Sequence, residues 1–181
     1  YDYYRGAALL ASKASVYSGS GVVCVCSSEK VIDALATVTP ECTSKLRNSK
    51  LEQELFYDRD AILIGSGLGL NEQSEQYVID TLQYANCPIV IDADGLTIAA
   101  KHLDLLKECP VPIILTPHFG EFKRLCAYDD ELDMIDKVGG FARKYGVTVV
   151  LKGPNTLITD GRETYRNITA NKAMATAGMG D

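Results

Sequence analysis

The chain closes with a short segment, Gly178 to Asp181, that combines two glycines with a carboxylate. Glycines before an aspartate allow successive backbone amides to converge on an anion. Such a nest can stabilise the charge that develops on a phosphoryl group during its transfer, and a carboxylate beside it can accept a proton from an attacking hydroxyl. The segment therefore predicts an anion site, with Asp181 as its catalytic base. Gly-x-Gly-Asp also occurs in plain turns.

A second glycine-rich segment runs from Gly65 to Gly69, with glycine at every other position. Without a Cβ atom, a glycine lets the backbone approach a ligand closely. The segment is not a Walker A loop, because no Gly-Lys-Ser/Thr follows it. It also misses the dinucleotide fingerprint, because Leu70 stands at the third glycine position. A ligand loop and a tight strand-to-helix turn both remain open.

Two carboxylates, Asp92 and Asp94, flank a small residue. On an extended segment both side chains would point to the same side. They could hold Mg²⁺ through water or bond the hydroxyls of a ligand. The alternative is that Asp94 caps a helix that begins near Gly95.

His118 and Lys152 are the other candidates for chemistry. His118 follows Pro117 and could orient a substrate or shuttle a proton, or it could simply bond to neighbouring backbone. Lys152 stands beside Gly153 after an apolar run, where an ammonium group suits a phosphate contact. His102 has charged neighbours and is expected to be solvated at the surface.

Composition narrows the class of protein. The 181 residues suit one domain, and the net charge of -6 argues against an electrostatically driven nucleic-acid binder. Backbone amides can still bind a small anionic ligand. No apolar run reaches the roughly 20 residues that span a bilayer. Neither nucleic acid nor a membrane is therefore an expected partner.

The six cysteines form no Cys-x-x-Cys pair, and only two histidines could assist them. A structural zinc site needs four clustered ligands, so no protein-held metal site is predicted. Several of the cysteines lie in apolar runs, which indicates small buried side chains in a reducing compartment.

Short β-branched runs alternate with amphipathic stretches along the whole chain. Continuous apolar runs indicate strands covered on both faces of a parallel sheet. The expected strands are Val22–Cys26, Ala61–Ile64, Ile89–Ile91, Ile113–Leu115, Val147–Leu151 and Thr156–Thr159. The expected helices are Gly6–Tyr17, Glu29–Leu35, Gln73–Tyr84, Leu96–Lys107, Gly120–Cys126 and Glu131–Tyr145. The pattern predicts an α/β fold with a central, mostly parallel sheet and helices on both faces.

Some boundaries carry their own signals. Asp129 or Asp130 could cap the last helix, and Gly146 is placed to end it. The adjacent glycines 139 and 140 weaken that helix by about 1 kcal/mol each relative to alanine. The polar span 38–58, which carries Pro40, is expected to be either a loop with a short helix or a join across residues that are missing from the sequence.

Four expected strands lead directly into the segments described above. Ligands of open α/β sheets bind beyond the carboxyl ends of the strands. The sequence therefore predicts that four segments meet along one rim and form a site, namely Gly65–Gly69, Asp92–Gly95, Thr116–Glu121 and Lys152–Thr156.

Taken in order, these segments resemble those of the ADP/ATP-dependent NAD(P)H-hydrate dehydratases, a family with the ribokinase-like fold. The matching motifs are Gly6-Ala7-Ala8-x-Leu10-Ala11, Ser18-Gly19-Ser20-Gly21-Val22-Val23, Gly65-Ser66-Gly67-Leu68-Gly69, Asp92-Ala93-Asp94-Gly95-Leu96, Thr116-Pro117-His118-x-Gly120-Glu121, Lys152-Gly153-x-x-Thr156 and Asn171-x-x-Met174-Ala175-Thr176 through Asp181.

The resemblance implies an enzyme that dehydrates the 6-hydroxy adduct of NADH or NADPH back to the working cofactor, at the expense of ADP or ATP. It implies Asp181 as the catalytic residue and Mg²⁺ that accompanies the phosphates. It also implies a homotetramer, and a cytoplasmic metabolite-repair role is expected. The hydrated dinucleotide is expected at Gly6, Ala7, Gly67, His118 and Asp181, and the adenine nucleotide at Lys152, Gly153, Thr156, Asn171, Gly178 and Gly180.

The chain departs from the family pattern in two respects. Ala170 stands where a glycine usually precedes the asparagine. Members of the family also begin earlier and continue past the aspartate, so residues 1–181 are expected to form one ribokinase-like domain that is incomplete at both ends and inactive in this form.

Two other functions remain open. A kinase of the same superfamily that phosphorylates a vitamin-precursor alcohol would use the same aspartate and the same anion site. A non-catalytic nucleotide-sensing domain would bind nucleotide without needing the base.

Overall fold

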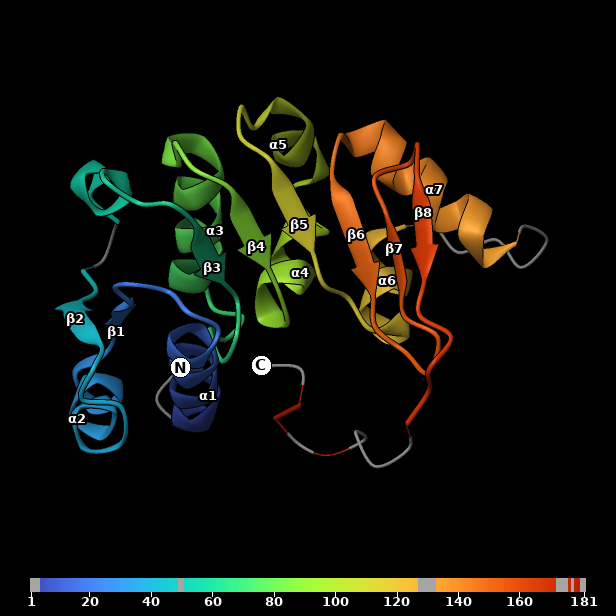
Figure 1. Cartoon of the computed structure of the whole chain (residues 1–181). Helices are drawn as coiled ribbons and strands as arrows, with labels where there is room; N and C mark the ends of the chain where they lie inside the picture. The colour runs from blue at the N-terminus through green and yellow to red at the C-terminus, as the bar shows by residue number, and fades with distance from the viewer. Residues whose placement is uncertain (1–3, 49–50, 127–132, 172–175, 177, 180–181) are drawn as a thin grey trace.

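The structure is a computed structural model that describes residues 4–48, 51–126, 133–171, 176, 178 and 179. Its main feature is a six-stranded sheet (Figure 1). Four neighbouring strands run parallel, and two further strands continue the sheet in antiparallel orientation. In order across the sheet they are β3 (Ile62–Ile64), β4 (Ile89–Ile91), β5 (Ile113–Leu115), β6 (Thr148–Leu151), β7 (Leu157–Thr159) and β8 (Thr164–Arg166). The predicted mostly parallel α/β architecture is confirmed.

Helices connect the parallel strands. They are α3 (Glu72–Tyr84), α4 (Asp94–Ala99), α5 (Leu103–Glu108), α6 (Phe119–Leu125) and α7 (Met134–Tyr145). In Figure 1, α3, α5 and α7 lie behind the sheet, on the same face. The parallel strands follow one another across the sheet in chain order, and right-handed crossovers then place every connecting helix on one side. Helices on both faces were expected, but these three share one face.

The burial of the strand residues alternates accordingly. Ile91, Leu115 and Val149 face the helices and are fully buried. On the opposite face, Leu63 of β3 is 46% exposed and Ile158 of β7 is 39% exposed. The core therefore lies between the sheet and its covering helices.

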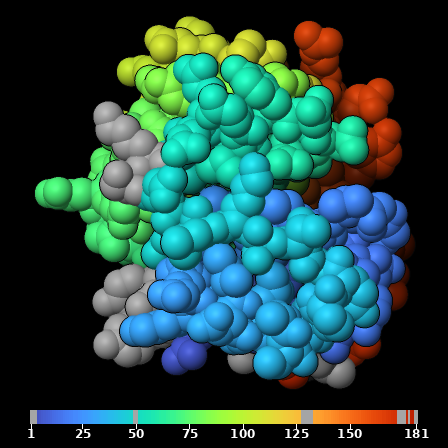
Figure 2. All heavy atoms as spheres, turned by 90° about the vertical axis from the view of Figure 1, so that its left-hand side faces the viewer, coloured from blue at the N-terminus to red at the C-terminus, as the bar shows by residue number. Residues whose placement is uncertain are grey.

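A smaller unit lies beside β3. It pairs β1 (Cys24–Ser27) in parallel with β2 (Thr43–Leu46), next to α1 (Arg5–Tyr17) and α2 (Glu29–Val38). Figure 2 shows this side, with α2 in blue below and the segment around the 3-10 helix η1 (Gln53–Phe56) in turquoise above. Phe56 anchors η1 in the main core, where its ring lies 6.3 Å from that of Tyr84.

Three expectations about the elements need correction. The predicted helix Leu96–Lys107 is two helices, α4 and α5, because the backbone leaves helical geometry at His102 (φ -129°, ψ 41°), which precedes α5. The span 38–58 contains the expected short helix, but also β2. Strand β8 was not predicted; it is short and its residues are exposed, so it carries no apolar pattern.

Helix α7 begins at Met134, and the side chain of Asp133 caps it by accepting a hydrogen bond from the amide of Ile135 at 3.3 Å. Asp129 and Asp130, the predicted caps, lie outside the described residues. Gly146 ends the helix in the left-handed conformation (φ 67°), as predicted.

The cysteines are free thiols of mixed exposure, with Cys87 buried and Cys26 exposed, so only some are the small core residues that were expected. In the part of the chain that the structure describes, no helix is long and apolar enough to cross a membrane.

Candidate active site

The four segments that follow β3, β4, β5 and β6 converge at the carboxyl edge of the sheet, as the sequence predicted. The amide of Gly69 donates to the carboxylate of Asp94 at 2.7 Å and so joins the first segment to the second. The amide of Lys152 donates to the carbonyl of Pro117 at 2.8 Å and joins the fourth to the third. We call this edge the rim.

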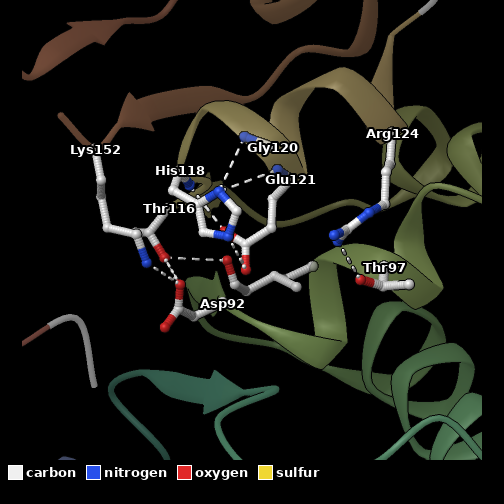
Figure 3. Close-up of polar contacts among 9 residues, drawn as sticks. Asp92, Thr97, Thr116, His118, Gly120, Glu121, Arg124 and Lys152 are labelled. Carbon is white, nitrogen blue, oxygen red and sulfur yellow. Dashed lines mark hydrogen bonds and ion pairs between the residues drawn. The ribbon is translucent and has the colours of Figure 1, made fainter. Parts of the chain in front are cut away.

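A buried carboxylate forms the centre of the rim. The residue Asp92 is 4% exposed, and its Oδ1 accepts two hydrogen bonds of 2.7 Å, from the Lys152 ammonium and from the Thr116 hydroxyl. Figure 3 shows the three side chains pointing toward one another from three neighbouring strand ends. The Lys152 side chain is 30% exposed, so its ammonium reaches from the buried carboxylate to the surface of the rim.

Asp92 and Asp94 do not form the pair of parallel carboxylates that extended backbone would give. Ala93 between them has a φ of 48°, in the left-handed region, which turns the chain into α4. Asp94 is also not the predicted helix cap: its carboxylate binds the Gly69 amide in the neighbouring loop. A non-glycine residue with this backbone conformation is unusual, and such residues cluster at functional sites.

The glycine-rich loop packs tightly at two positions. A Cβ atom at Gly65 would lie 1.8 Å from the carbonyl oxygen of Asp92, and the residue has a φ of 125°. A Cβ atom at Gly67 would lie 2.8 Å from the carbonyl oxygen of Tyr4 and 3.1 Å from the Cβ atom of Ala7. The structure thus brings Gly67 beside the start of α1, where the substrate was expected. Gly6, in the same first turn, is exposed and open to solvent.

Ser66, in the same loop, has a buried hydroxyl oxygen without a hydrogen-bond partner among the described residues. An unsatisfied buried hydroxyl usually costs about 1–3 kcal/mol. The buried Ser66 hydroxyl therefore destabilises the folded loop next to the rim.

His118 caps helix α6. Its Nδ1 accepts hydrogen bonds from the amides of Gly120 at 2.9 Å and Glu121 at 3.3 Å, and the Glu121 carboxylate accepts from the His118 amide at 2.8 Å. The predicted bonding to neighbouring backbone is confirmed for this nitrogen. The opposite nitrogen, Nε2, lies 3.5 Å from Glu121 Oε1, and the side chain is 55% exposed, so the imidazole can still meet a ligand at the rim.

His102 is not the solvated surface residue that was expected. Its Nε2 lies 2.6 Å from the carboxylate of Glu75, which also accepts a hydrogen bond from Lys101 at 3.1 Å. The cluster connects α3 to the segment between α4 and α5.

The predicted nucleotide segment after β6 forms its own turn. The Thr156 hydroxyl donates to the carbonyl of Gly153 at 3.0 Å. Asn171 is exposed, and Gly178 has a φ of 80° in a turn in which the Met179 amide donates to the Thr176 carbonyl at 3.3 Å. Gly180 and Asp181 lie outside the described residues.

Asp92 and Asp94 do not form the magnesium site that an extended backbone between them would allow. Asp92 is engaged by an ammonium and a hydroxyl, and Asp94 by a backbone amide. Among the described residues, no three His, Cys, Asp or Glu side chains are grouped as metal ligands. The cation that Asp92 holds is the Lys152 ammonium.

Sequence reasoning missed two contacts of this region. It considered Asp92 and Lys152 separately and did not pair them, although both were candidates. It also gave no role to Arg124 of α6, whose guanidinium donates to the Thr97 hydroxyl of α4 at 3.2 Å (Figure 3). Only the order of the strands in the sheet could have revealed the contact between Asp92 and Lys152.

Comparison with known proteins gives the rim a family context. A sequence profile of the NAD(P)H-hydrate dehydratases matches residues 1–181. An ADP-dependent (S)-NAD(P)H-hydrate dehydratase from Listeria monocytogenes is 36% identical over 98% of this chain, which spans 64% of that protein.

Solved structures agree. A ribokinase-like superfamily protein from Enterococcus faecalis superposes with a TM-score of 0.88 at 28% identity, over 98% of this chain and 63% of that one. An ADP/ATP-dependent NAD(P)H-hydrate dehydratase from Bacillus subtilis, co-crystallised with ATP and Mg²⁺ and soaked with CoA, superposes with a TM-score of 0.82 at 33% identity. The match covers 98% of this chain and 66% of that one. The predicted ribokinase-like fold is confirmed, and the chain belongs to the NAD(P)H-hydrate dehydratase family.

Proposed function

We propose that the protein dehydrates the 6-hydroxy adducts of NADH and NADPH back to the working cofactors and consumes ADP or ATP. The observation that carries the proposal is the rim. Four strand ends bring the glycine-rich loop, Asp92, His118 and Lys152 to one edge of the sheet, in a chain that matches this family over all its residues. Because the chain spans less than two thirds of its curated relatives, the activity is assigned to the complete protein.

The adenine nucleotide would bind along the segment after β6. Lys152 would contact a phosphate, Gly153 and Thr156 would supply backbone and hydroxyl groups, and Asn171, Gly178 and Gly180 would complete the site. An ammonium with N–H donors beyond the one bound to Asp92 suits phosphate oxygens, and so do the backbone amides of glycine-rich segments.

The hydrated dinucleotide would bind on the opposite side of the rim. Gly67 lies against the start of α1, so Gly6 and Ala7 would contact the same ligand. His118 would offer its exposed imidazole nitrogen. The two ligands would then meet at Asp181.

Asp181 would accept the proton of the C6 hydroxyl while that oxygen attacks the terminal phosphoryl group of the nucleotide. The amides of Gly178 and Gly180 would stabilise the charge on the transferring group. Loss of phosphate from C6 and of a proton from the neighbouring carbon would restore the ring double bond. Mg²⁺ would be bound by the phosphates, since the described carboxylates of the rim are already engaged.

The test is direct. The complete protein is incubated with hydrated NADH, Mg²⁺ and either ADP or ATP, and recovery of absorbance in the reduced-nicotinamide band is followed. Recovery with at least one nucleotide is expected, and Asp181→Asn should reduce its rate by at least about a hundredfold, as expected for the loss of a general base. No recovery with either nucleotide would refute the proposal.

The same assay separates the alternatives. A superfamily kinase would transfer phosphate to an alcohol and leave a stable phosphorylated product, without recovery of NADH. A nucleotide sensor would bind nucleotide with unchanged behaviour in Asp181→Asn. We further propose a cytoplasmic homotetramer, which light scattering on the purified protein and fractionation of cells would test.

A further inference from the structure

We propose that Asp92 is a positioning residue that holds the Lys152 ammonium ready for the phosphates of the nucleotide. This inference rests on the proposed nucleotide site. It adds a residue that does not touch the ligand and acts through Lys152.

The geometry makes Asp92 the anchor of the lysine. Its carboxylate comes from the end of β4 and the ammonium from the end of β6, with β5 between them. A lysine side chain has many rotamers in solution, and a fixed partner removes most of them before a ligand arrives. The 2.7 Å ion pair selects the rotamer that extends across the end of β5.

The two side chains of the pair differ in burial, and this difference orients the ammonium toward the surface. The Asp92 side chain is 6% exposed and the Lys152 side chain 30%. The carboxylate is therefore enclosed by protein, and the ammonium lies between the carboxylate and the surface. A lysine has three N–H donors, so after the bond to Asp92 two remain for phosphate oxygens.

Thr116 holds the carboxylate in turn. Its hydroxyl donates to the same Oδ1 atom at 2.7 Å, and also lies 3.4 Å from the carbonyl of Ile91 in β4. The carboxylate is thus fixed by the end of β5, the strand that lies between the two partners (Figure 3). The arrangement explains why a buried carboxylate stands at a site that should bind an anion: it keeps the neighbouring cation in place.

The experiment is a double-mutant cycle on nucleotide binding, measured by titration calorimetry with ADP and Mg²⁺ on the complete protein. Asp92→Ala should raise the Kd for ADP about tenfold, which corresponds to 1.4 kcal/mol. Asp92→Asn retains an oxygen acceptor of the same shape and should raise it less. Thr116→Val should also have a smaller effect than Asp92→Ala, in the same direction.

The informative variant is Asp92→Ala in a Lys152→Met background. If Asp92 acts through the lysine, it should change the Kd there by less than about twofold. A tenfold rise that persists without the lysine would show a general structural role and overturn the proposal. Tighter ADP binding by Asp92→Ala would also overturn it, because Asp92 would then compete with the nucleotide for the ammonium.

Asp80→Ala is the matched control. Asp80 is likewise 4% exposed, but it lies in α3 and accepts from neutral groups, the Gln76 amide at 2.7 Å and the Leu51 backbone amide at 3.2 Å. It should lower stability without changing the Kd for ADP. A parallel change of the Kd in Asp80→Ala and Asp92→Ala would again mean that the loss of a buried carboxylate, and not of a positioned lysine, is being measured.

The binding assay keeps this proposal separate from the proposed function. ADP binding that responds to Asp92 as described, without recovery of NADH, would refute the dehydratase activity and leave the positioning role intact. Recovery of NADH with no coupling between Asp92 and Lys152 would do the reverse.

Discussion

At the residue scale, the rim is governed by hydrogen bonds to carboxylates. Asp92 holds an ammonium, Asp94 holds the backbone of the glycine-rich loop, and Glu121 completes the cap of α6. Hydrogen bonds to charged groups contribute about 1.5–3 kcal/mol, more than those between neutral groups. These three contacts explain how short loops keep a defined geometry at the ends of three-residue strands.

Away from the rim, Glu75 offers a test of electrostatics. Hydrogen bonds from His102 and then Lys101 hold the pKa of its carboxyl below the ordinary value. In the unfolded chain the carboxyl takes up a proton at higher pH than in the folded protein. The ion-pair stabilisation is therefore present above the ordinary glutamate pKa of about 4.3, and is lost as the pH falls through the lower folded value.

We predict that Glu75→Gln makes stability less dependent on pH in this acid window. The slope of Tm against pH measures this dependence, with thermal unfolding followed by circular dichroism between about pH 3 and 6. Some acid dependence should remain, because backbone hydrogen bonds from Glu163 and Arg162 lower the pKa of Asp160 as well. An unchanged slope in the variant would mean that the Glu75 cluster is too exposed to contribute.

At the element scale, the start of helix α6 is determined by its N-terminal cap. His118 supplies an acceptor for two amides of the first turn, and the helix has only seven residues. A lost cap typically costs about 1 kcal/mol. The same side chain is the proposed substrate contact, so its two roles have to be separated.

Asparagine at position 118 separates them, because it is a good N-cap without an imidazole. We predict that His118→Ala lowers the free energy of unfolding by about 1 kcal/mol, and that His118→Asn lowers it by less than half of that. Both should raise the KM for the hydrated dinucleotide in the complete protein. A normal KM in His118→Asn would show that the histidine is a cap alone.

Helix α7 carries the two adjacent glycines that weaken it. Gly140 is exposed, its backbone φ is not in the left-handed region, and an added Cβ atom would meet nothing within 4 Å. We predict that Gly140→Ala stabilises the protein by about 1 kcal/mol and raises Tm by about 2–4 °C.

Gly161→Ala is the contrasting variant. Its Cβ atom would lie 2.7 Å from the Gly139 carbonyl oxygen, and its φ is 85°. It should lower Tm, because both the space and the backbone conformation exclude a side chain. Calorimetric Tm values of the two variants distinguish an effect of helix propensity from a general tolerance of alanine at glycine positions. A lower Tm in Gly140→Ala would contradict the assignment of α7.

At the scale of the whole molecule, the core forms on one face of the sheet. Phe122 of α6 is fully buried and makes an edge-to-face contact with Phe141 of α7, with 5.6 Å between ring centroids. These rings connect the helices that follow β5, and so support the segment that carries His118.

We predict that Phe122→Ala lowers the free energy of unfolding by about 3–5 kcal/mol, measured by urea denaturation. Phe119→Ala in the same helix is the control: that ring is 42% exposed and lies under the Lys123 ammonium at 4.6 Å. Its loss should cost less than about 1 kcal/mol. Equal losses of unfolding free energy in the two variants would contradict the placement of Phe122 in the core and of Phe119 at the surface.

The sequence by itself determined the mostly parallel α/β architecture and the place where the four segments of the rim meet. β-branched runs covered by amphipathic helices specify a parallel sheet, and that topology requires the segments after the strands to meet at one edge. The glycines at 65 and 67, Asp92, His118 and Lys152 were therefore found from composition and position alone. Asp181 was identified from the Gly-x-Gly-Asp pattern and from the family resemblance, and its role stays a prediction.

Only the tertiary structure decided how those residues pair. Asp92 and Lys152 are 60 positions apart, and their contact depends on the order of the strands, which local pattern does not encode. The turn at Ala93, the break between α4 and α5, and the pairing of β8 with β7 were likewise seen only in the folded chain. Periodicity reports which residues are buried, whereas the partner of a buried charge is chosen by the folded arrangement around it.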